Sequence, residues 1–160
     1  MSEHRAGVSW KLAEDGEAFV AGRYSRAHAL RFDDGLEVPG TPSPSVVPAP
    51  WSRTAAVDPE AAFTAALSAC HMLWFLDLAR QAGFAVASYE DDAVGTLARI
   101  GRQRMAMTRV VLRPRIVFTG EKIPTAAELD DLHHRAHEHC FIANSVTTEV
   151  VVEAPGDETP

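Results

Sequence analysis

Residues 58–83, DPEAAFTAALSACHMLWFLDLARQAG, decide the fold. Asp58 is placed to cap the amino terminus of a helix, Pro59 suits the first helical position, and Gly83 is placed to end the helix. From Phe63 to Leu78 the segment is apolar on nearly every face, and a helix that is apolar all round is buried all round. The sequence therefore predicts a central helix, covered by a sheet on one side and by a second subunit on the other.

The residues before this helix predict strands and then a long loop. Residues 7–32 alternate between apolar and polar side chains in places and lead to the turn signal Asp33-Asp34-Gly35, which predicts a meander of two or three strands. Residues 39–50 hold five of the ten prolines, so we expect no regular structure there.

The residues after the helix predict an alternation of strands with a second helix. Residues 84–99 and 105–119 have strand patterns, and Pro114 indicates an edge strand or a bulge in the second of them. Thr125 and Glu128 form a capping-box pattern for a helix that runs to about Cys140, and residues 146–153 form a last strand. The order predicts a single α+β domain over residues 1–160, with a flexible N-terminus 1–5 and a flexible tail 154–160.

Composition excludes several classes of protein. The 160-residue chain is 46% hydrophobic, enough to bury the core of one domain. Its formal net charge of -7 and its scattered basic residues argue against a nucleic-acid partner. No stretch approaches about 20 consecutive apolar residues, and the N-terminus lacks the apolar segment of a signal peptide. We therefore expect a soluble, cytoplasmic protein with no membrane partner.

The segment HHRAHEHC, residues 133–140, raises the possibility of a metal site. His133, His137 and Cys140 are spaced i, i+4, i+7 on one helical face, and three such ligands can hold zinc. The same face carries Leu129, Leu132 and Ala136 and so docks onto the core. This favours structural histidines over a metal site, and we expect no metal.

The segments DPEAAFTAALSACHMLWFL (58–76) and AHEHCFIANSV (136–146) resemble the OsmC/Ohr family, the osmotically inducible and organic hydroperoxide resistance proteins. The resemblance covers roughly Gly22 to Val152, and His71 fits the OsmC-like branches better than the Ohr branch. It implies an OsmC-like fold, with antiparallel sheets around a long buried central helix in an intertwined homodimer. It also implies a cysteine-based peroxidase that reduces organic hydroperoxides.

The resemblance also implies the site residues. Cys70 matches the cysteine that attacks the peroxide, and Cys140 matches the cysteine that resolves the product by forming a disulfide. Glu60 matches the acidic residue of the family, and Arg26 is the best match to its arginine, although Arg23 also fits. The chain departs from many relatives at one position next to the site, where Phe141 replaces a proline after the second cysteine.

The chemistry of a peroxidatic thiol explains why these residue types occur together. The thiolate is the nucleophile, and a cysteine with a pKa near 8.5 is only a few per cent ionised at neutral pH. A guanidinium, which stays protonated, would stabilise the thiolate, and a carboxylate would hold the guanidinium in place. An external dithiol would then reduce the Cys70–Cys140 disulfide, and no cofactor is required.

Glu60 and Cys70 are ten residues apart, about 15 Å along a straight helix. Either the chain is not helical near Glu60, or the carboxylate and the arginine reach the thiol of a second subunit. The second possibility favours a homodimer. Two other functions stay open: an OsmC-like protein that binds a small apolar ligand without turnover, and a zinc protein that uses His133, His137 and Cys140.

Overall fold

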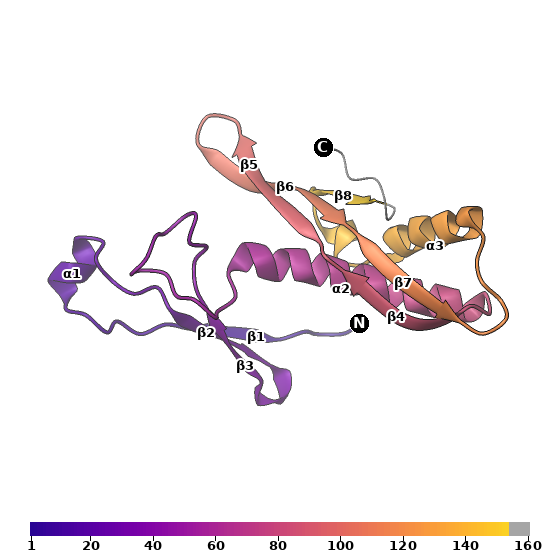
Figure 1. Ribbon diagram of the computed structural model, residues 1–160. Coiled ribbons are helices and arrows are strands. Elements are labelled where there is room, and N and C mark those ends of the chain that lie inside the picture. The colour runs from indigo at the N-terminus through magenta and orange to yellow at the C-terminus, as the bar shows by residue number, and fades with distance from the viewer. Residues whose placement is uncertain (154–160) are drawn as a thin grey trace. The chain divides into compact units, whose positions relative to one another are not determined.

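The computed structural model describes residues 1–153, so the predicted flexible tail 154–160 lies outside the described residues (Figure 1). The chain divides into two compact units, Met1–Ala62 and Phe63–Pro160, and each is described by itself. Helices and mainly antiparallel strands are mixed along the chain, which confirms the α+β prediction. The elements are, in order, β1 Ala6–Ser9, α1 Gly16–Val20, β2 His28–Phe32, η1 Asp33–Gly35, β3 Glu37–Gly40, α2 Pro59–Gln81, β4 Ala85–Asp91, β5 Val94–Ile100, β6 Arg104–Leu112, β7 Pro114–Thr119, α3 Ala126–His139, η2 Ala143–Ser145 and β8 Glu149–Val152.

The N-terminal unit is a three-stranded antiparallel sheet in the order β1-β2-β3. The meander predicted over residues 7–32 is present only at the two ends of that range, in β1 and β2, because residues 10–27 are not strand and include the short helix α1, which was not predicted; β3 follows the predicted range. Asp15 caps this helix, since its carboxylate accepts the Ala18 N–H at 2.7 Å. The prediction of no regular structure over residues 39–50 is wrong for Pro39 and Gly40, which lie in β3, and holds for residues 41–50, which form no helix or strand.

The helix α2 begins and ends where the sequence predicts. The Asp58 carboxylate accepts the Ala61 N–H at 2.8 Å, and Gly83 has the positive φ of 80° that favours glycine beyond a helix end. By length and composition alone α2 could cross a membrane, but the core helix of a globular protein passes the same test. One face is buried within the chain, through Thr64, Leu67, His71, Phe75, Leu78 and Ala79.

The opposite face of α2 is not buried within one chain, contrary to the literal expectation of burial on all sides. Its exposed residues include Ala65, Ala66, Ala69 and Leu73, and Leu73 is 63% exposed. These side chains are small or apolar. That a second subunit covers this face stays a prediction.

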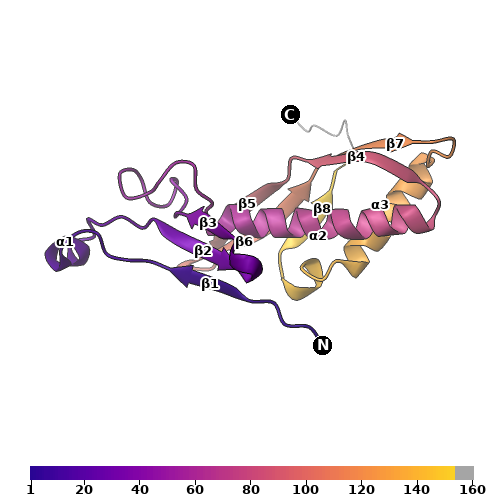
Figure 2. The ribbon, with the colours of Figure 1, turned by 90° about the horizontal axis from the view of Figure 1, so that it is seen from below.

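The C-terminal unit contains two sheets, β4-β7 and β5-β6-β8, packed against α2 and α3 (Figure 2). All its strand pairs are antiparallel except β6 with β8, which is parallel. One core cluster joins α2 to α3 through Phe75, Leu78, Ala79, Leu132 and Ala136, with Phe84 beside them. The other joins α2 to β6 through Leu67, Val110 and Leu112.

Two predicted strands of this unit are each divided in the structure. Residues 84–99 form β4 and β5, and residues 105–119 form β6 and β7, which are separated at Arg113. Pro114 cannot donate to a ladder, and the Arg113 N–H instead donates to the Asp91 carboxylate at 2.6 Å. The break lets β6 pair with β5 while β7 pairs with β4.

The helix α3 begins with the predicted capping box. The Thr125 hydroxyl accepts the Glu128 N–H, and the Glu128 carboxylate accepts the Thr125 N–H at 2.9 Å. The helix ends with Cys140 as its C-cap residue. The last strand was predicted over residues 146–153, but β8 is shorter and covers only Glu149–Val152.

Candidate functional site

The structure brings Cys70 and Cys140 together within the C-terminal unit. Cys70 is half-buried on α2, and Cys140 is 1% exposed at the end of α3. Both are free thiols, and the Cys140 thiol is close enough to form a hydrogen bond with Cys70. The two sulfur atoms, 70 positions apart in the sequence, are therefore neighbours.

Cys140 lies in surroundings that keep its proton in place. Burial, and to a lesser extent the hydrogen bond with Cys70, raise its pKa to about 11. The backbone N–H of Ala143 donates to the Cys140 sulfur at 3.4 Å and acts in the opposite direction. Cys140 is thus a protonated thiol at neutral pH, and its S–H can donate to the sulfur of Cys70.

A pocket of about 530 Å³ opens beside Cys70. Phe141 and Trp74 meet there edge to face with ring centroids 5.4 Å apart, and the His139 ring stacks on Trp74 at 5.0 Å. The pocket is lined mainly by apolar side chains, and its volume lies within the range of small-molecule sites. Its lining residues are Ala66, Ala69, Cys70, Leu73, Trp74, Asp77, Phe141 and Ile142.

The predicted charged residues belong to the N-terminal unit. Arg26 is half-buried, with its guanidinium carbon 4.0 Å from the centre of the Tyr24 ring and its Nη1 donating to the Tyr24 carbonyl at 3.1 Å. Arg23 is exposed. Glu60 is half-buried in the first turn of α2, so the chain is helical at this residue.

Arg26 also lines a pocket of about 420 Å³ in the N-terminal unit. Trp10, Phe19 and Tyr24 pack together there, with ring centroids 4.6 to 5.9 Å apart. Beside them His28 Nδ1 contacts the Arg26 carbonyl at 2.9 Å. The aromatic cluster and the hydrogen bonds hold the arginine in one place instead of leaving it mobile in solvent.

Two histidines of residues 133–140 contact rings of α2, His133 with His71 and His139 with Trp74, whereas the buried Nδ1 of His137 has no hydrogen-bond partner among the described residues. His133 Nδ1 is 3.0 Å from Nε2 of His71, which is 1% exposed, and Cys140 faces Cys70. Within residues 1–153 no group of three or more His, Cys, Asp or Glu side chains is arranged to hold a metal ion. The geometry therefore does not support the zinc alternative. The His71–His133 contact was not predicted, although both residues lie on helix faces that carry core side chains.

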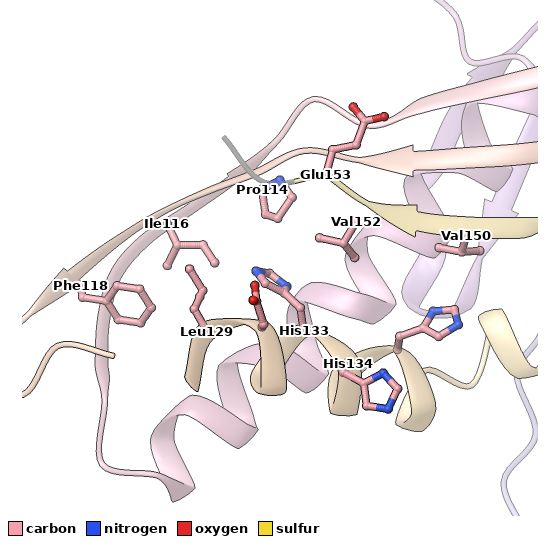
Figure 3. A pocket seen from close by; sticks show the side chains of 11 residues that line it. Pro114, Ile116, Phe118, Leu129, His133, His134, Val150, Val152 and Glu153 are labelled. Carbon is pink, nitrogen blue, oxygen red and sulfur yellow. The ribbon is translucent and has the colours of Figure 1, made fainter. Parts of the chain in front are cut away.

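A second pocket of the C-terminal unit, of about 570 Å³, lies between α3 and the strands β7 and β8 (Figure 3). His133 projects into this space from α3, toward Pro114 and Val152, and His134 lies at the edge of the pocket on the exposed side of the helix (Figure 3). Apolar side chains from the strands form the opposite wall, including Ile116, Phe118 and Val150. His133 is therefore half-buried, in contrast to the buried His71.

Comparison with known proteins gives a consistent family. The family described as OsmC-like protein matches residues 52–154. The solved structure of an OsmC-like protein of unknown function from Vibrio cholerae is 53% identical, with a TM-score of 0.92 over 97% of this chain and 100% of that chain. No curated protein matches the chain.

More distant solved structures share the fold. An organic hydroperoxide resistance protein OsmC from Legionella pneumophila is 19% identical, with a TM-score of 0.67 over 96% of each chain. An organic hydroperoxide resistance protein from Elizabethkingia anophelis is 18% identical, with a TM-score of 0.69 over 96% of this chain and 94% of that chain. At these identities the likeness concerns the fold alone.

Proposed function

This chain belongs to the OsmC-like protein family, and from that premise we propose that it is a thiol-dependent peroxidase that reduces organic hydroperoxides to alcohols. Cys70 is the attacking cysteine and Cys140 the resolving cysteine. The observation that carries the proposal is the contact of the two thiols beside a pocket with mainly apolar walls.

The reaction begins at the Cys70 sulfur. The thiolate attacks the O–O bond, an S–O bond forms as the O–O bond breaks, and the alkoxide leaves as an alcohol after taking a proton. The apolar walls beside Cys70, which include Leu73 and Trp74, suit the hydrocarbon part of an organic hydroperoxide. Cys70 is left as a sulfenic acid.

Cys140 then closes the disulfide. Its sulfur attacks the Cys70 sulfenic sulfur, and the hydroxide that leaves takes the Cys140 proton to become water. The raised pKa of Cys140 keeps this thiol protonated and so disfavours it as the cysteine that attacks the peroxide. An external dithiol supplies two electrons and two protons and restores both thiols.

Arg26 and Glu60 supply the charges of the site under this proposal. The guanidinium stabilises the Cys70 thiolate and the departing alkoxide, and the Glu60 carboxylate orients the guanidinium. Proteins of this family are commonly homodimers. Because Glu60 is helical, we propose that these two residues serve the thiol of the second subunit in a homodimer. Arg26 fits better than Arg23, since its guanidinium is already held by Tyr24.

The remaining parts of the proposal concern the setting. We propose a single OsmC-like domain, a cytoplasmic location that keeps both cysteines reduced between turnovers, and no nucleic-acid or membrane partner. Binding of a small apolar ligand without turnover is the second candidate, favoured by the same pocket beside Cys70.

One experiment separates turnover from binding alone. Free thiols are counted after one equivalent of cumene hydroperoxide, and the products are mapped by mass spectrometry. Turnover predicts the loss of two thiols and an intramolecular Cys70–Cys140 bond. Cys70→Ser should abolish peroxide consumption, and Cys140→Ser should allow one turnover and trap an oxidised Cys70. Unchanged thiols in the wild type would leave ligand binding as the function.

A further inference from the structure

The interface between α2 and α3 is mainly apolar, and a pair of histidines crosses it, His71 buried and His133 half-buried, with His137 also close enough to act on the charge of His71. His71 of α2 and His133 of α3 share a hydrogen bond of 3.0 Å between Nε2 and Nδ1. Their rings are nearly parallel, with an angle of 10° and centroids 5.3 Å apart. The residues that surround this interface are Phe75, Leu78, Ala79, Leu132 and Ala136.

A hydrogen bond inside an apolar interface has a directional requirement that the apolar contacts lack. Apolar side chains repack when a helix slides or rotates by one residue, which is about 1.5 Å and 100°. The nitrogen pair of His71 and His133 meets in only one such setting, and a shift would leave buried polar atoms without partners. Stacking of Phe75 on His133, with centroids 4.6 Å apart, restrains the ring further. The pair therefore selects one register for α3 on α2.

This register determines where the Cys140 sulfur lies. Cys140 follows His133 by seven residues, about two helical turns, and lies on the same side of α3. On α2, His71 directly follows Cys70. A contact between the two histidines therefore fixes α3 at the distance and rotation that bring Cys140 to Cys70.

We propose that His71 and His133 are positioning residues that set the register of α3 on α2 and thereby present the Cys140 sulfur to Cys70. This inference rests on the proposed function only for the use of the disulfide in turnover. The positioning itself concerns two thiols and two helices, and it can be measured without a peroxide.

The ionisation of the pair agrees with this role. Burial lowers the pKa of His71 to about 3 and that of His133 to about 4, and the second value is reached despite Asp130 and Asp91, which act in the opposite direction. Both rings are therefore neutral at physiological pH. A neutral imidazole has one donor and one acceptor nitrogen, so one ring donates to the other without an unpaired charge in the core.

The test measures disulfide closure with diamide, which takes two electrons and two protons from the thiols as the S–S bond forms. The stability of the Cys70–Cys140 disulfide is measured in dithiothreitol redox buffers. We expect His71→Leu and His133→Leu each to weaken the disulfide about tenfold, which is about 30 mV in reduction potential, and to slow closure by a similar factor.

Conservative variants provide the matched rescue. The Gln amide nitrogen or oxygen occupies the place of His Nε2, and the corresponding Asn atoms occupy the place of His Nδ1. In His71→Gln and His133→Asn, the equilibrium constant for forming the Cys70–Cys140 disulfide should therefore stay within about twofold of the wild-type value. His134→Gln, on the exposed side of α3, is the control and should behave as the wild type.

The outcomes separate this inference from the proposed function. Closure with diamide but not with cumene hydroperoxide would defeat the peroxidase and leave the positioning role intact. Wild-type potentials in both leucine variants would overturn the positioning role, as would a failure of both amide variants to rescue. If a single leucine variant does not fold, the double variant His71→Leu/His133→Leu is measured in its place, since it puts an apolar pair in the interface. A wild-type reduction potential in the double variant would also overturn the positioning role.

Discussion

Phe141 and Trp74 meet edge to face, with ring centroids 5.4 Å apart, and form one wall of the pocket beside Cys70. Phe141 directly follows Cys140, yet 68% of it is exposed. A side chain this exposed contributes little to the core. Its place beside the thiol instead suits contact with a substrate.

Phe141→Ala should weaken the use of bulky hydroperoxides. The variant loses one aromatic face, which we expect to raise the KM for cumene hydroperoxide about three- to tenfold. The rate with hydrogen peroxide, which does not need the wall, should stay unchanged. Steady-state kinetics with cumene hydroperoxide and with hydrogen peroxide measures the two effects. Ile123→Ala, which removes another exposed apolar side chain, is the control. Equal losses with both peroxides would show that Phe141 does not select the substrate.

Arg26→Gln should reduce activity far more than Arg23→Gln. Removing a donor that stabilises developing negative charge lowers kcat by about 100- to 1000-fold in other enzymes. We expect a loss of this size for Arg26, together with slower alkylation of Cys70 by iodoacetamide at pH 7. The exposed Arg23 is its matched control. A larger loss in the Arg23 variant would transfer the role to that residue.

The buried histidine pair should make the fold sensitive to acid. The pKa values of His71 and His133 are lowered from 6.5 to about 3 and about 4. Between these values and 6.5 the unfolded chain binds more protons than the folded chain, so the free energy of unfolding falls as the pH falls. Each lowered pKa contributes to this fall by up to about 1.4 kcal/mol per pH unit.

Urea unfolding from pH 7.5 to 5.0 measures this effect. His71→Gln/His133→Asn removes both titrating rings and keeps amides in their place. Its free energy of unfolding should fall less steeply below pH 6.5 than that of the wild type. Parallel curves for the two proteins would contradict the lowered pKa values.

Asp91 should contribute to stability by joining α2 to the junction of β6 and β7. Its carboxylate accepts the Ser68 hydroxyl at 2.5 Å and the Arg113 N–H at 2.6 Å. Asp91→Ala removes both acceptor oxygens, so the Ser68 hydroxyl and the Arg113 N–H lose this partner, at a cost of about 1–3 kcal/mol. Urea unfolding at pH 7 measures the difference.

Asp92→Ala is the matched control for that variant. Asp92 pairs with Arg115 at 2.7 Å, but both side chains are more than half exposed. An exposed ion pair contributes about 0–1 kcal/mol, so this neighbour should change stability less than Asp91. Similar losses in the two variants would mean that the two hydrogen bonds of Asp91 add no stability beyond that of an exposed ion pair.

Local signals in the sequence predicted the helices better than the strands. The ends of α2 and the capping box of α3 depend on residues a few positions apart, such as Asp58 and the Thr125 and Glu128 pair. The division of residues 105–119 into β6 and β7 depends instead on Asp91, which lies 22 positions before Arg113. Periodicity contains no information about such a distant acceptor. The helix α1 was missed because its five residues are too few to show a period.

The candidate site was predicted only in part, for a similar reason. Resemblance to a family identified Cys70 and Cys140, and the structure makes them neighbours. The His71–His133 contact depends on how α2 and α3 are rotated against each other, which neither helix alone specifies. The choice between Arg26 and Arg23 depends on the side-chain contacts of Tyr24, which spacing to a turn does not show.

The division of the chain at residue 62 has a consequence for how the protein evolves. Both sulfur atoms and the aromatic wall beside them are encoded after this point, while the guanidinium and the carboxylate are encoded before it. Under the proposed mechanism, substitutions before residue 63 would change how fast the thiol reacts, and substitutions after it would change which peroxide reaches the thiol.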